Sequence, residues 1–314
     1  MNSNGKQILH SELVQEVLQG LQKPQKEIPS KYFYDQRGSE LFEKICNLEE
    51  YYPADAEMAI MEQNIDEIAQ KLGEDIKLIE FGSGSSRKTR LLLSNLKNIV
   101  AYVPVDISEK FLQKQAELLK KEYPELDIYP VAADYTKTFE IPAGIPSARK
   151  VVYFPGSTIG NFTRSKAKKF MRKIARLVKP DGGLLIGVDM KKDIKTLEAA
   201  YNDAKGITAQ FNKNLLVRLN READADFDPE KFEHKAFYNE HKDRIEMHLE
   251  SLTEHEVEVA GKKILFLKGE TIHTENSYKY SADEFRDLAS EFFEAEEMWT
   301  DPDHLFSVHY LKVI

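Results

Sequence analysis

The sequence predicts an α/β protein built on a doubly wound parallel sheet that ends in an antiparallel hairpin, with a smaller α+β domain attached. Short apolar runs alternate with helical patterns over residues 77–188, which is typical of βαβ units. The alternation stops over residues 191–280, where strand-like runs follow one another, and a helix with two strands closes the chain. This order of elements is explained if the strand-rich segment at 191–280 is inserted into the domain that contains the parallel sheet.

Helices are expected to fill most of the first seventy residues. An apolar stripe predicts an amphipathic helix over residues 8–22, and a polar linker with two prolines follows at 22–30. Further helices are expected at residues 39–48 and 53–72. The stripe consists of Leu9, Leu13, Val17 and Leu21.

Five apolar runs predict the parallel strands, with a helix between most neighbouring pairs and right-handed connections. The expected strands are residues 77–81, 99–105, 127–131, 151–154 and 184–188. The expected helices are residues 87–96, 108–122 and 163–179.

The insertion begins with two helical patterns and continues with four alternating, strand-like runs. The helices are expected at 194–204 and 206–222, and the strands at 234–240, 244–252, 255–260 and 262–268. Gly261 and Lys262 are expected to form the hairpin turn between the last two strands. The tail is expected to fold as a helix at 282–293 and strands at 295–301 and 305–314.

Composition limits the functional classes. Of 314 residues, 41% are hydrophobic and 31% charged, which is the composition of an ordinary globular protein. With 44 basic and 53 acidic residues the net charge is −9, which argues against nucleic-acid or anionic-membrane partners. Cys46 is the one cysteine, so we expect no internal disulfide. No secretory signal or membrane-spanning run is visible, and we expect a cytoplasmic protein.

A glycine loop follows the first predicted sheet strand. Gly82-Ser83-Gly84-Ser85-Ser86 leads into a helix at Arg87, where the third glycine of a dinucleotide fingerprint is replaced by arginine. Asp106 closes the second strand 22 positions after Gly84, where a carboxylate can hold ribose hydroxyls. Asp134 and Tyr135 follow the third strand, where they can hold an adenine. Each feature taken alone is equally typical of a plain turn or a helix cap.

Two ligands fit this pattern, a nicotinamide dinucleotide and S-adenosylmethionine. A pyrophosphate favours the third glycine, whereas S-adenosylmethionine carries no phosphate. A terminal helix followed by a strand hairpin is also typical of methyltransferases and unusual in dinucleotide dehydrogenases. The sequence therefore favours the methyl donor.

Long motifs then identify a family. KYFYDQRGSELFEKI, EYYP, EFGSGSSRKTRLLL, FPGSTIGNF, RIEMHL and GETIHTENSYKY resemble, in order, the histidine Nα-methyltransferases of ergothioneine biosynthesis. The resemblance runs from Tyr32 to the end of the chain. It implies a class I methyltransferase (Rossmann-like) core, S-adenosylmethionine as methyl donor, and Nα-trimethylation of L-histidine to hercynine. It also implies a substrate-binding domain formed by residues 1–52 and 191–280, with the core formed by 53–190 and 281–314.

The resemblance also assigns site residues. The cofactor positions that it implies are Gly82, Lys88, Asp106, Asp134, Tyr135 and Gly156. Asn161 and Tyr201 resemble the residues that hold the substrate carboxylate, and Tyr51, Glu275 and Ser277 resemble the set that reads the imidazole. On a strand, Glu275 and Ser277 would face the same side. Without the family match, a solvent-facing pair is the simpler interpretation.

Two further positions follow from the resemblance. Met247 resembles a residue that lines the ring pocket, and Tyr34 lies where the family places a tyrosine near the amine. Tyr34 is the candidate catalytic residue, since its hydroxyl can accept or relay a proton. Methyl transfer to a neutral amine depends mostly on positioning the reactants, so a dedicated base is not required.

Other interpretations are weaker. The basic segment at 164–179 has an apolar stripe, so its lysines are expected on a solvated helix face rather than on RNA. None of the eight histidines belongs to a recognised metal-ligand motif, and we expect no metal. A monomer acting on a small amino acid is expected. The alternatives are another substrate (tryptophan, tyrosine or a modified histidine) and a non-catalytic S-adenosylmethionine-binding protein.

Overall fold

A computed structural model describes residues 3–83 and 87–314 of the chain. The chain divides into two compact units. Unit 1 comprises Met1–Tyr51 and Asp193–Ser277, and unit 2 comprises Tyr52–Lys192 and Tyr278–Ile314. In the described part of the chain, no helix is long and apolar enough to cross a membrane.

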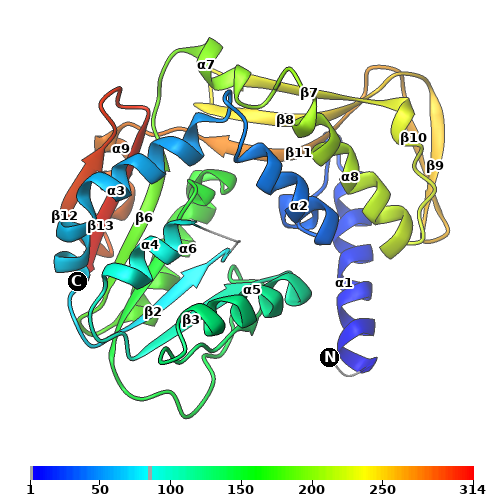
Figure 1. The fold of residues 1–314 in the computed structure, drawn as a ribbon. Helices are drawn as coiled ribbons and strands as arrows, with labels where there is room; N and C mark the ends of the chain where they lie inside the picture. Colours follow the sequence, from blue (N-terminus) through cyan, green and yellow to red (C-terminus); the bar gives the residue numbers. More distant parts are fainter. Residues whose placement is uncertain (1–2, 84–86) are drawn as a thin grey trace. The chain divides into compact units, whose positions relative to one another are not determined.

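Unit 2 is built on a seven-stranded sheet in the order β12-β13-β6-β5-β2-β3-β4 (Figure 1). The five strands from β6 to β4 are parallel, and β13 and β12 add an antiparallel hairpin. This is the doubly wound sheet with a terminal hairpin that the sequence predicts. The strands are β2 (Ile76–Phe81), β3 (Ala101–Asp106), β4 (Val131–Ala132), β5 (Arg149–Phe154), β6 (Gly183–Asp189), β12 (Phe293–Thr300) and β13 (Phe306–Val313).

Apolar side chains of helices cover both faces of this sheet. One core cluster contains residues of α3 (Tyr52–Leu72) and α4 (Arg87–Asn95), and the other contains residues of α6 (Arg164–Val178) and α9 (Ala282–Ala289). α5 (Glu109–Glu122) contributes to the first cluster through Leu119. The apolar stripe expected on α6 is confirmed as core, since its members are all buried: Ala167, Phe170, Met171, Ile174 and Val178.

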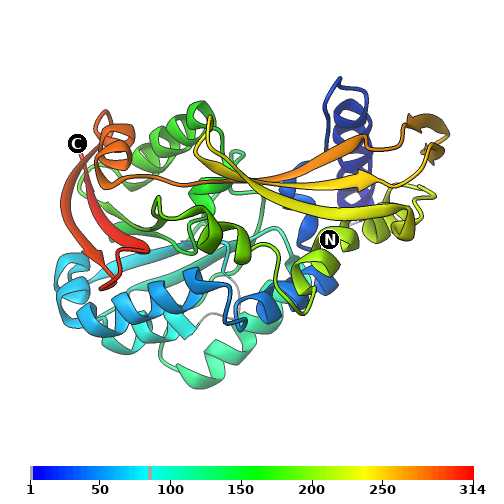
Figure 2. The same ribbon diagram turned by 90° about the horizontal axis from the view of Figure 1, so that it is seen from above.

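Unit 1 combines helices with a four-stranded sheet in the order β1-β11-β8-β7, whose three long strands run side by side in Figure 2. A separate hairpin pairs β9 with β10. Its helices are α1 (Ser3–Leu21), α2 (Gln36–Ile45), α7 (Ile194–Ala199) and α8 (Ile207–Glu222). Its strands are β1 (Lys26–Glu27), β7 (Phe232–Asn239), β8 (Arg244–Ser251), β9 (His255–Val259), β10 (Lys262–Phe266) and β11 (Thr271–Tyr278).

Several local predictions need correction. β4 spans only Val131–Ala132 where a strand is expected at 127–131, and the helix expected at 194–204 ends at Ala199. β11 is a further strand beyond the four expected in the insertion.

The linker expected at 22–30 contains the two-residue strand β1, which pairs in parallel with β11 at Ile272 and His273. The hairpin turn between β9 and β10 is formed by Ala260 and Gly261, because Lys262 already pairs with Val259. Both turn residues have positive φ, 47° and 77°, as a tight turn that matches the strand twist requires.

Candidate functional site

The carboxyl ends of the parallel strands of unit 2 carry the predicted cofactor residues. The strand order reverses between β2 and β5, and open α/β sheets bind ligands at this edge. Gly82 follows β2 with φ of +71°, and its N–H donates to the carbonyl of Val105 at 2.9 Å. Ser83 is buried, and its hydroxyl has no hydrogen-bond partner among the described residues, so a bound ligand can satisfy it. Gly84, Ser85 and Ser86 lie outside the described residues.

Asp106 is the last residue of β3. Its carboxylate accepts a hydrogen bond from the Ser108 N–H at 2.7 Å. Burial raises the pKa of Asp106 to about 6, and backbone hydrogen bonds from Ser108 and Ile107 oppose that rise. A half-buried carboxylate at this edge matches the acceptor that two ribose hydroxyls need.

Asp134 and Tyr135 follow β4. The Asp134 carboxylate accepts from the Thr136 N–H at 2.9 Å. The Tyr135 ring stacks on Phe81, with centroids 5.4 Å apart and planes 11° apart, and burial raises the pKa of its hydroxyl. One face of the Tyr135 ring therefore packs in the core. The expected contact with an adenine would have to be made by the other face of the ring, its edge or the backbone.

Glu57 joins two predicted cofactor residues, Lys88 and Gly156, although no pattern in the sequence points to it. This fully buried glutamate of α3 accepts from the Gly156 N–H at 2.9 Å and pairs with the Lys88 ammonium of α4. Gly156 follows β5 with φ of +73°. Glu57 thus holds two donors at the carboxyl edge of the sheet.

Glu80, a second buried carboxyl group, lies within β2. It accepts from Tyr102 at 2.6 Å and from Thr89 at 2.9 Å. Burial raises its pKa to about 7, although these two hydrogen bonds oppose the rise. Glu80 therefore braces β2, β3 and α4 around the glycine loop. Asn161, expected to hold the substrate carboxylate, ends a short 3-10 helix (Thr158–Asn161) after β5.

The aromatic residues predicted for substrate binding lie together in unit 1. The rings of Tyr34 and Tyr51 both meet the Phe42 ring edge-on, at centroid distances of 5.7 Å and 6.2 Å. Tyr51 also meets Tyr201 edge-on at 6.2 Å. Phe42 was missed, because its position on α2 is equally typical of a core residue.

β11 supplies the polar partners of this aromatic row. The Tyr201 hydroxyl donates to Ser277 Oγ at 2.8 Å. Burial raises the pKa of Tyr51 well above its usual value, and the nearby Tyr201 and Glu275 add to this rise. Met247 is fully buried on the neighbouring strand β8, and its carbonyl accepts from Thr274 at 3.0 Å.

A hydrogen-bonded chain holds Tyr201 and β11 in place. His234 Nε2 contacts the Tyr201 carbonyl at 2.9 Å, and His234 Nδ1 contacts Asn212 Nδ2 at 2.9 Å. Thr274 donates to Asn212 Oδ1 at 2.8 Å. Burial lowers the pKa of His234, so its imidazole is neutral near pH 7. These residues support the site, and no motif in the sequence marks them.

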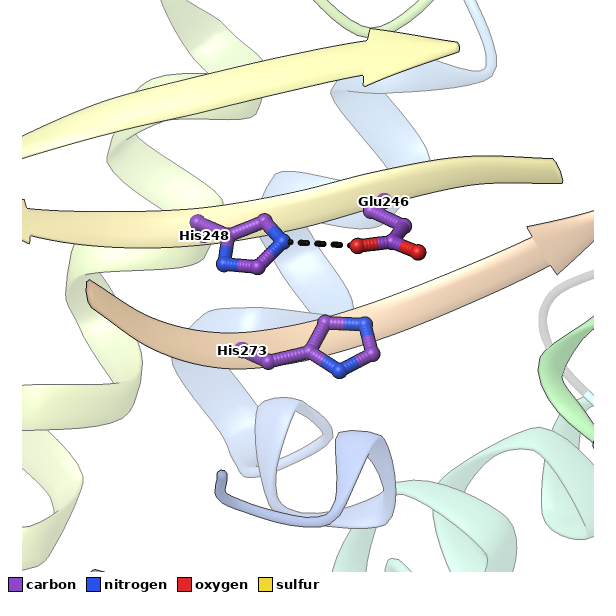
Figure 3. A group of neighbouring side chains, drawn as sticks. All are labelled: Glu246, His248 and His273. Carbon is purple, nitrogen blue, oxygen red and sulfur yellow. Dashed lines mark hydrogen bonds and ion pairs between the residues drawn. The ribbon is translucent and has the colours of Figure 1, made fainter. Parts of the chain in front are cut away.

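A cluster of different chemistry lies on β8 and β11. Glu246, His248 and His273 offer ligand atoms that all lie within 4.8 Å of one another, and Figure 3 shows the three side chains converging. Burial lowers the pKa of His273 to about 4, whereas hydrogen bonds from His248 and Arg244 hold the pKa of Glu246 far below its usual value despite burial. The expectation of no metal rests on the absence of a sequence motif, and no motif describes this cluster, because strand pairing adds His273 to it.

The predicted residues thus divide between the units. Unit 2 contains the cofactor set and Asn161: Gly82, Lys88, Asp106, Asp134, Tyr135, Gly156 and Asn161. Unit 1 contains the candidate catalytic tyrosine and the ring-recognition set: Tyr34, Tyr51, Tyr201, Met247, Glu275 and Ser277. The predicted cofactor residues therefore belong to one unit, and the residues predicted to recognise the ring belong to the other.

Comparison with known proteins gives one consistent result. A family model described as histidine-specific methyltransferase, SAM-dependent, matches residues 13–313. The chain is 38% identical to a histidine N-alpha-methyltransferase of Mycobacterium tuberculosis, over 96% of this chain and 94% of that protein. It is 38% identical to a protein of the same name from Mycolicibacterium smegmatis, over 92% and 91%. It is 30% identical to ergothioneine biosynthesis protein 1 of Schizosaccharomyces pombe, over 83% of this chain and 35% of that protein.

Proposed function

The chain belongs to the family of histidine-specific, S-adenosylmethionine-dependent methyltransferases, and we propose that it trimethylates the α-amino group of L-histidine to make hercynine for ergothioneine biosynthesis. The observation that carries the proposal is the family match over residues 13–313. The residues of the two units described above agree with the chemistry that this reaction needs.

The carboxyl edge of unit 2 suits the methyl donor. Asp106 would accept hydrogen bonds from the ribose hydroxyls. Gly82 allows close approach of the ligand because, in the described part of the chain, no atom beyond its two chain neighbours lies within 4 Å of its would-be Cβ. Lys88 would hold the carboxylate of the ligand, with Glu57 orienting the ammonium group. When bound, S-adenosylmethionine supplies an electrophilic methyl group on a sulfonium sulfur.

The polar pair on β11 suits a neutral imidazole. Such a ring has one N–H donor and one acceptor nitrogen. The Glu275 carboxylate would accept the N–H, and the Ser277 hydroxyl would donate to the other nitrogen. Tyr201, which donates its one hydroxyl proton to Ser277 Oγ in the structure, would turn that proton to the substrate carboxylate. An apolar ring of similar shape would leave both protein groups unpaired, which is a strong basis for discrimination.

The amine has to lose its proton before each transfer. A nearby sulfonium cation disfavours the ammonium form, so binding itself lowers the pKa of the amine. Tyr34 would accept or relay the proton, with its ring held edge-on by Phe42 and Phe211. Asn161 and Tyr201 would fix the substrate carboxylate, so that catalysis comes mainly from positioning.

Mass spectrometry of a panel of free amino acids, incubated with the chain and S-adenosylmethionine, tests the proposal. The expected result is a gain of three methyl groups on histidine, with mono- and dimethyl species appearing earlier. Methylation of tryptophan or tyrosine in preference to histidine would contradict the assigned roles of Tyr51, Glu275 and Ser277. A chain that binds S-adenosylmethionine but methylates no amino acid would contradict the enzyme itself.

We also propose that the enzyme works as a monomer in the cytoplasm and that the reaction needs no metal. The single cysteine, Cys46, supports a reducing compartment. Light scattering coupled to gel filtration should give a mass close to the 36.1 kDa of one chain, and a dimer mass would contradict the monomer.

A further inference from the structure

Two strands of unit 1 bring three side chains of metal-ligand type together, outside the residues that the methyl transfer uses. Glu246 and His248 are two residues apart on β8, so the alternation of the strand puts them on one side, with Met247 on the other. His273 comes from the other long strand, β11, and its ring lies 4.8 Å from the His248 ring. Glu246 and His248 are buried, and His273 is half-buried.

We propose that Glu246, His248 and His273 bind a divalent transition-metal ion of the zinc class, clamping β8 to β11. Zinc binds imidazole nitrogen and carboxylate oxygen at about 2.0–2.2 Å, which sets its ligand atoms about 3.3–3.6 Å apart in a tetrahedral site. Glu246 Oε2 and His248 Nε2 lie 3.1 Å apart, so they separate by only a few tenths of an ångström to hold the ion. The His273 ring stacks on His248 with planes 17° apart, so it turns about its side-chain torsions to bring its lone pair to the ion.

The second ring nitrogen of each histidine has the partner that metal-bound imidazoles use. His273 Nε2 contacts the Glu275 carbonyl at 2.9 Å, and a carbonyl only accepts, so Nδ1 carries the lone pair of the neutral ring. His248 Nδ1 lies 3.2 Å from the Thr271 hydroxyl. When Nε2 of His248 binds the ion, its proton moves to Nδ1, which then donates to Thr271 Oγ1.

The carboxylate is also oriented by its neighbours. Glu246 Oε1 accepts from Arg244 Nε at 2.8 Å and from Asn239 at 2.9 Å, which turns Oε2 toward His248. Phe237 stacks on His248 at 5.4 Å and shields that ring from solvent. Arg244 and Lys242 place positive charge beside Glu246, so we expect weaker binding than in structural sites built from four cysteines and histidines.

Equilibrium dialysis of the untagged, chelator-treated chain against Zn²⁺, with metal counted by mass spectrometry, measures the site. We expect about one ion per chain and a melting temperature that rises with Zn²⁺, because an ion that binds only the folded state stabilises it. The double variant His248→Gln/His273→Gln should bind at least about tenfold more weakly, since it loses two of three ligands. The double variant His241→Gln/His304→Gln changes two exposed histidines outside the cluster and should bind as the wild type does.

The far-ultraviolet circular dichroism spectrum of the cluster variant, compared with that of the wild type, checks that both units are folded. Should that variant not fold, ¹⁵N spectra of the wild-type imidazoles during Zn²⁺ titration decide the matter. Shifts confined to His248 and His273 support the site. Equal zinc affinity in the cluster and control variants, no zinc bound by the wild type, or shifts at other histidines would overturn the proposal and leave a purely hydrogen-bonded cluster.

Discussion

The Tyr34 hydroxyl allows a test of how protons leave the substrate amine. In Tyr34→Phe the ring keeps its edge-on contacts with Phe42 and Phe211, and only the hydroxyl is lost. Because positioning carries most of the catalysis and water can take the proton, we expect kcat to fall by less than about tenfold. Steady-state kinetics on histidine measures this, with Tyr238→Phe on β7 as the matched control. A loss of about a thousandfold would instead make Tyr34 a dedicated general base.

The buried Glu80 carboxyl predicts a pH-dependent stability. Its folded pKa, about 7, lies above the ordinary value of 4.5. At a pH below 4.5 the carboxyl group is neutral in both the folded and the unfolded chain, so its burial does not lower the stability of the fold. As pH rises through this window the unfolded chain ionises first, so the stability of the fold decreases, by about 3 kcal/mol once pH exceeds the folded pKa.

Glu80→Gln removes this dependence, because glutamine mimics the neutral carboxyl group. Relative to the wild type, the variant should gain about 3 kcal/mol of unfolding free energy between about pH 5 and about pH 8. Urea unfolding at both pH values measures the difference, and Glu74→Gln, at an exposed site before β2, is the control. A pH-independent difference between Glu80→Gln and wild type would refute the assigned pKa.

The sequence identifies individual site residues unevenly. Asp106 can be predicted, because an acidic residue at the end of the second strand is placed where it can bind the ribose hydroxyls of a ligand. Glu57 cannot, since on an amphipathic helix it resembles any solvated glutamate, and only the fold brings it to Lys88 and Gly156. Glu246 and His248 share a strand face by their spacing, but the pairing with β11 that adds His273 is tertiary.

The β9–β10 hairpin tests turn chemistry. Ala260 and Gly261 both have positive φ, and alanine adopts this region at a cost of about 1–2 kcal/mol. Ala260→Asn creates the favoured Asn-Gly turn and should stabilise the protein by about 0.5–1 kcal/mol, whereas Gly261→Ala should destabilise it by about 1 kcal/mol. Chemical unfolding of both variants measures the pair. Equal effects of the same sign would contradict the turn type.

Elements with strong periodicity are predicted well from the sequence. Most strands and helices of the large sheet lie within a few residues of the expected ranges, because βαβ units repeat a local pattern that each segment carries by itself. The strand expected at 127–131 is the exception, since β4 spans only Val131–Ala132. β1 is different, since two residues have no period and Lys26–Glu27 is a strand only through its pairing with β11. The hairpin turn was misplaced by one residue for the same reason, because register depends on both strands.

In the molecule as a whole, the chain passes between the units after Tyr51, Lys192 and Ser277. A buried ion network in unit 2 lies beside all three points. Asp189 accepts from Tyr52 at 2.7 Å and pairs with Lys192 and the fully buried Lys279. These two lysines lower the pKa of Asp189 despite its burial. The network therefore fixes the ends of three segments of unit 2.

Lys279→Met should destabilise the fold by about 1–3 kcal/mol, because it removes one of the two charged donors to the buried Asp189 carboxylate and leaves Lys192 as the other. Urea unfolding at neutral pH measures the loss. Lys312→Met breaks an exposed pair with Glu296 and should cost less than about 1 kcal/mol. Similar small losses in both variants would show that the buried network contributes no more than a surface ion pair.

We assign recognition of the substrate ring to unit 1 and of the methyl donor to unit 2, and this assignment can be tested by binding. Isothermal titration calorimetry measures the affinities of Glu275→Gln and Asp106→Asn for L-histidine and for S-adenosylhomocysteine. Glu275→Gln should weaken histidine binding by about tenfold or more and leave S-adenosylhomocysteine affinity within about twofold, because it removes only the charged partner of the imidazole. Asp106→Asn should weaken S-adenosylhomocysteine binding by a similar factor. Loss of both ligands alike in Glu275→Gln, or wild-type S-adenosylhomocysteine affinity in Asp106→Asn, would contradict the assignment of substrate ring and methyl donor to the two units.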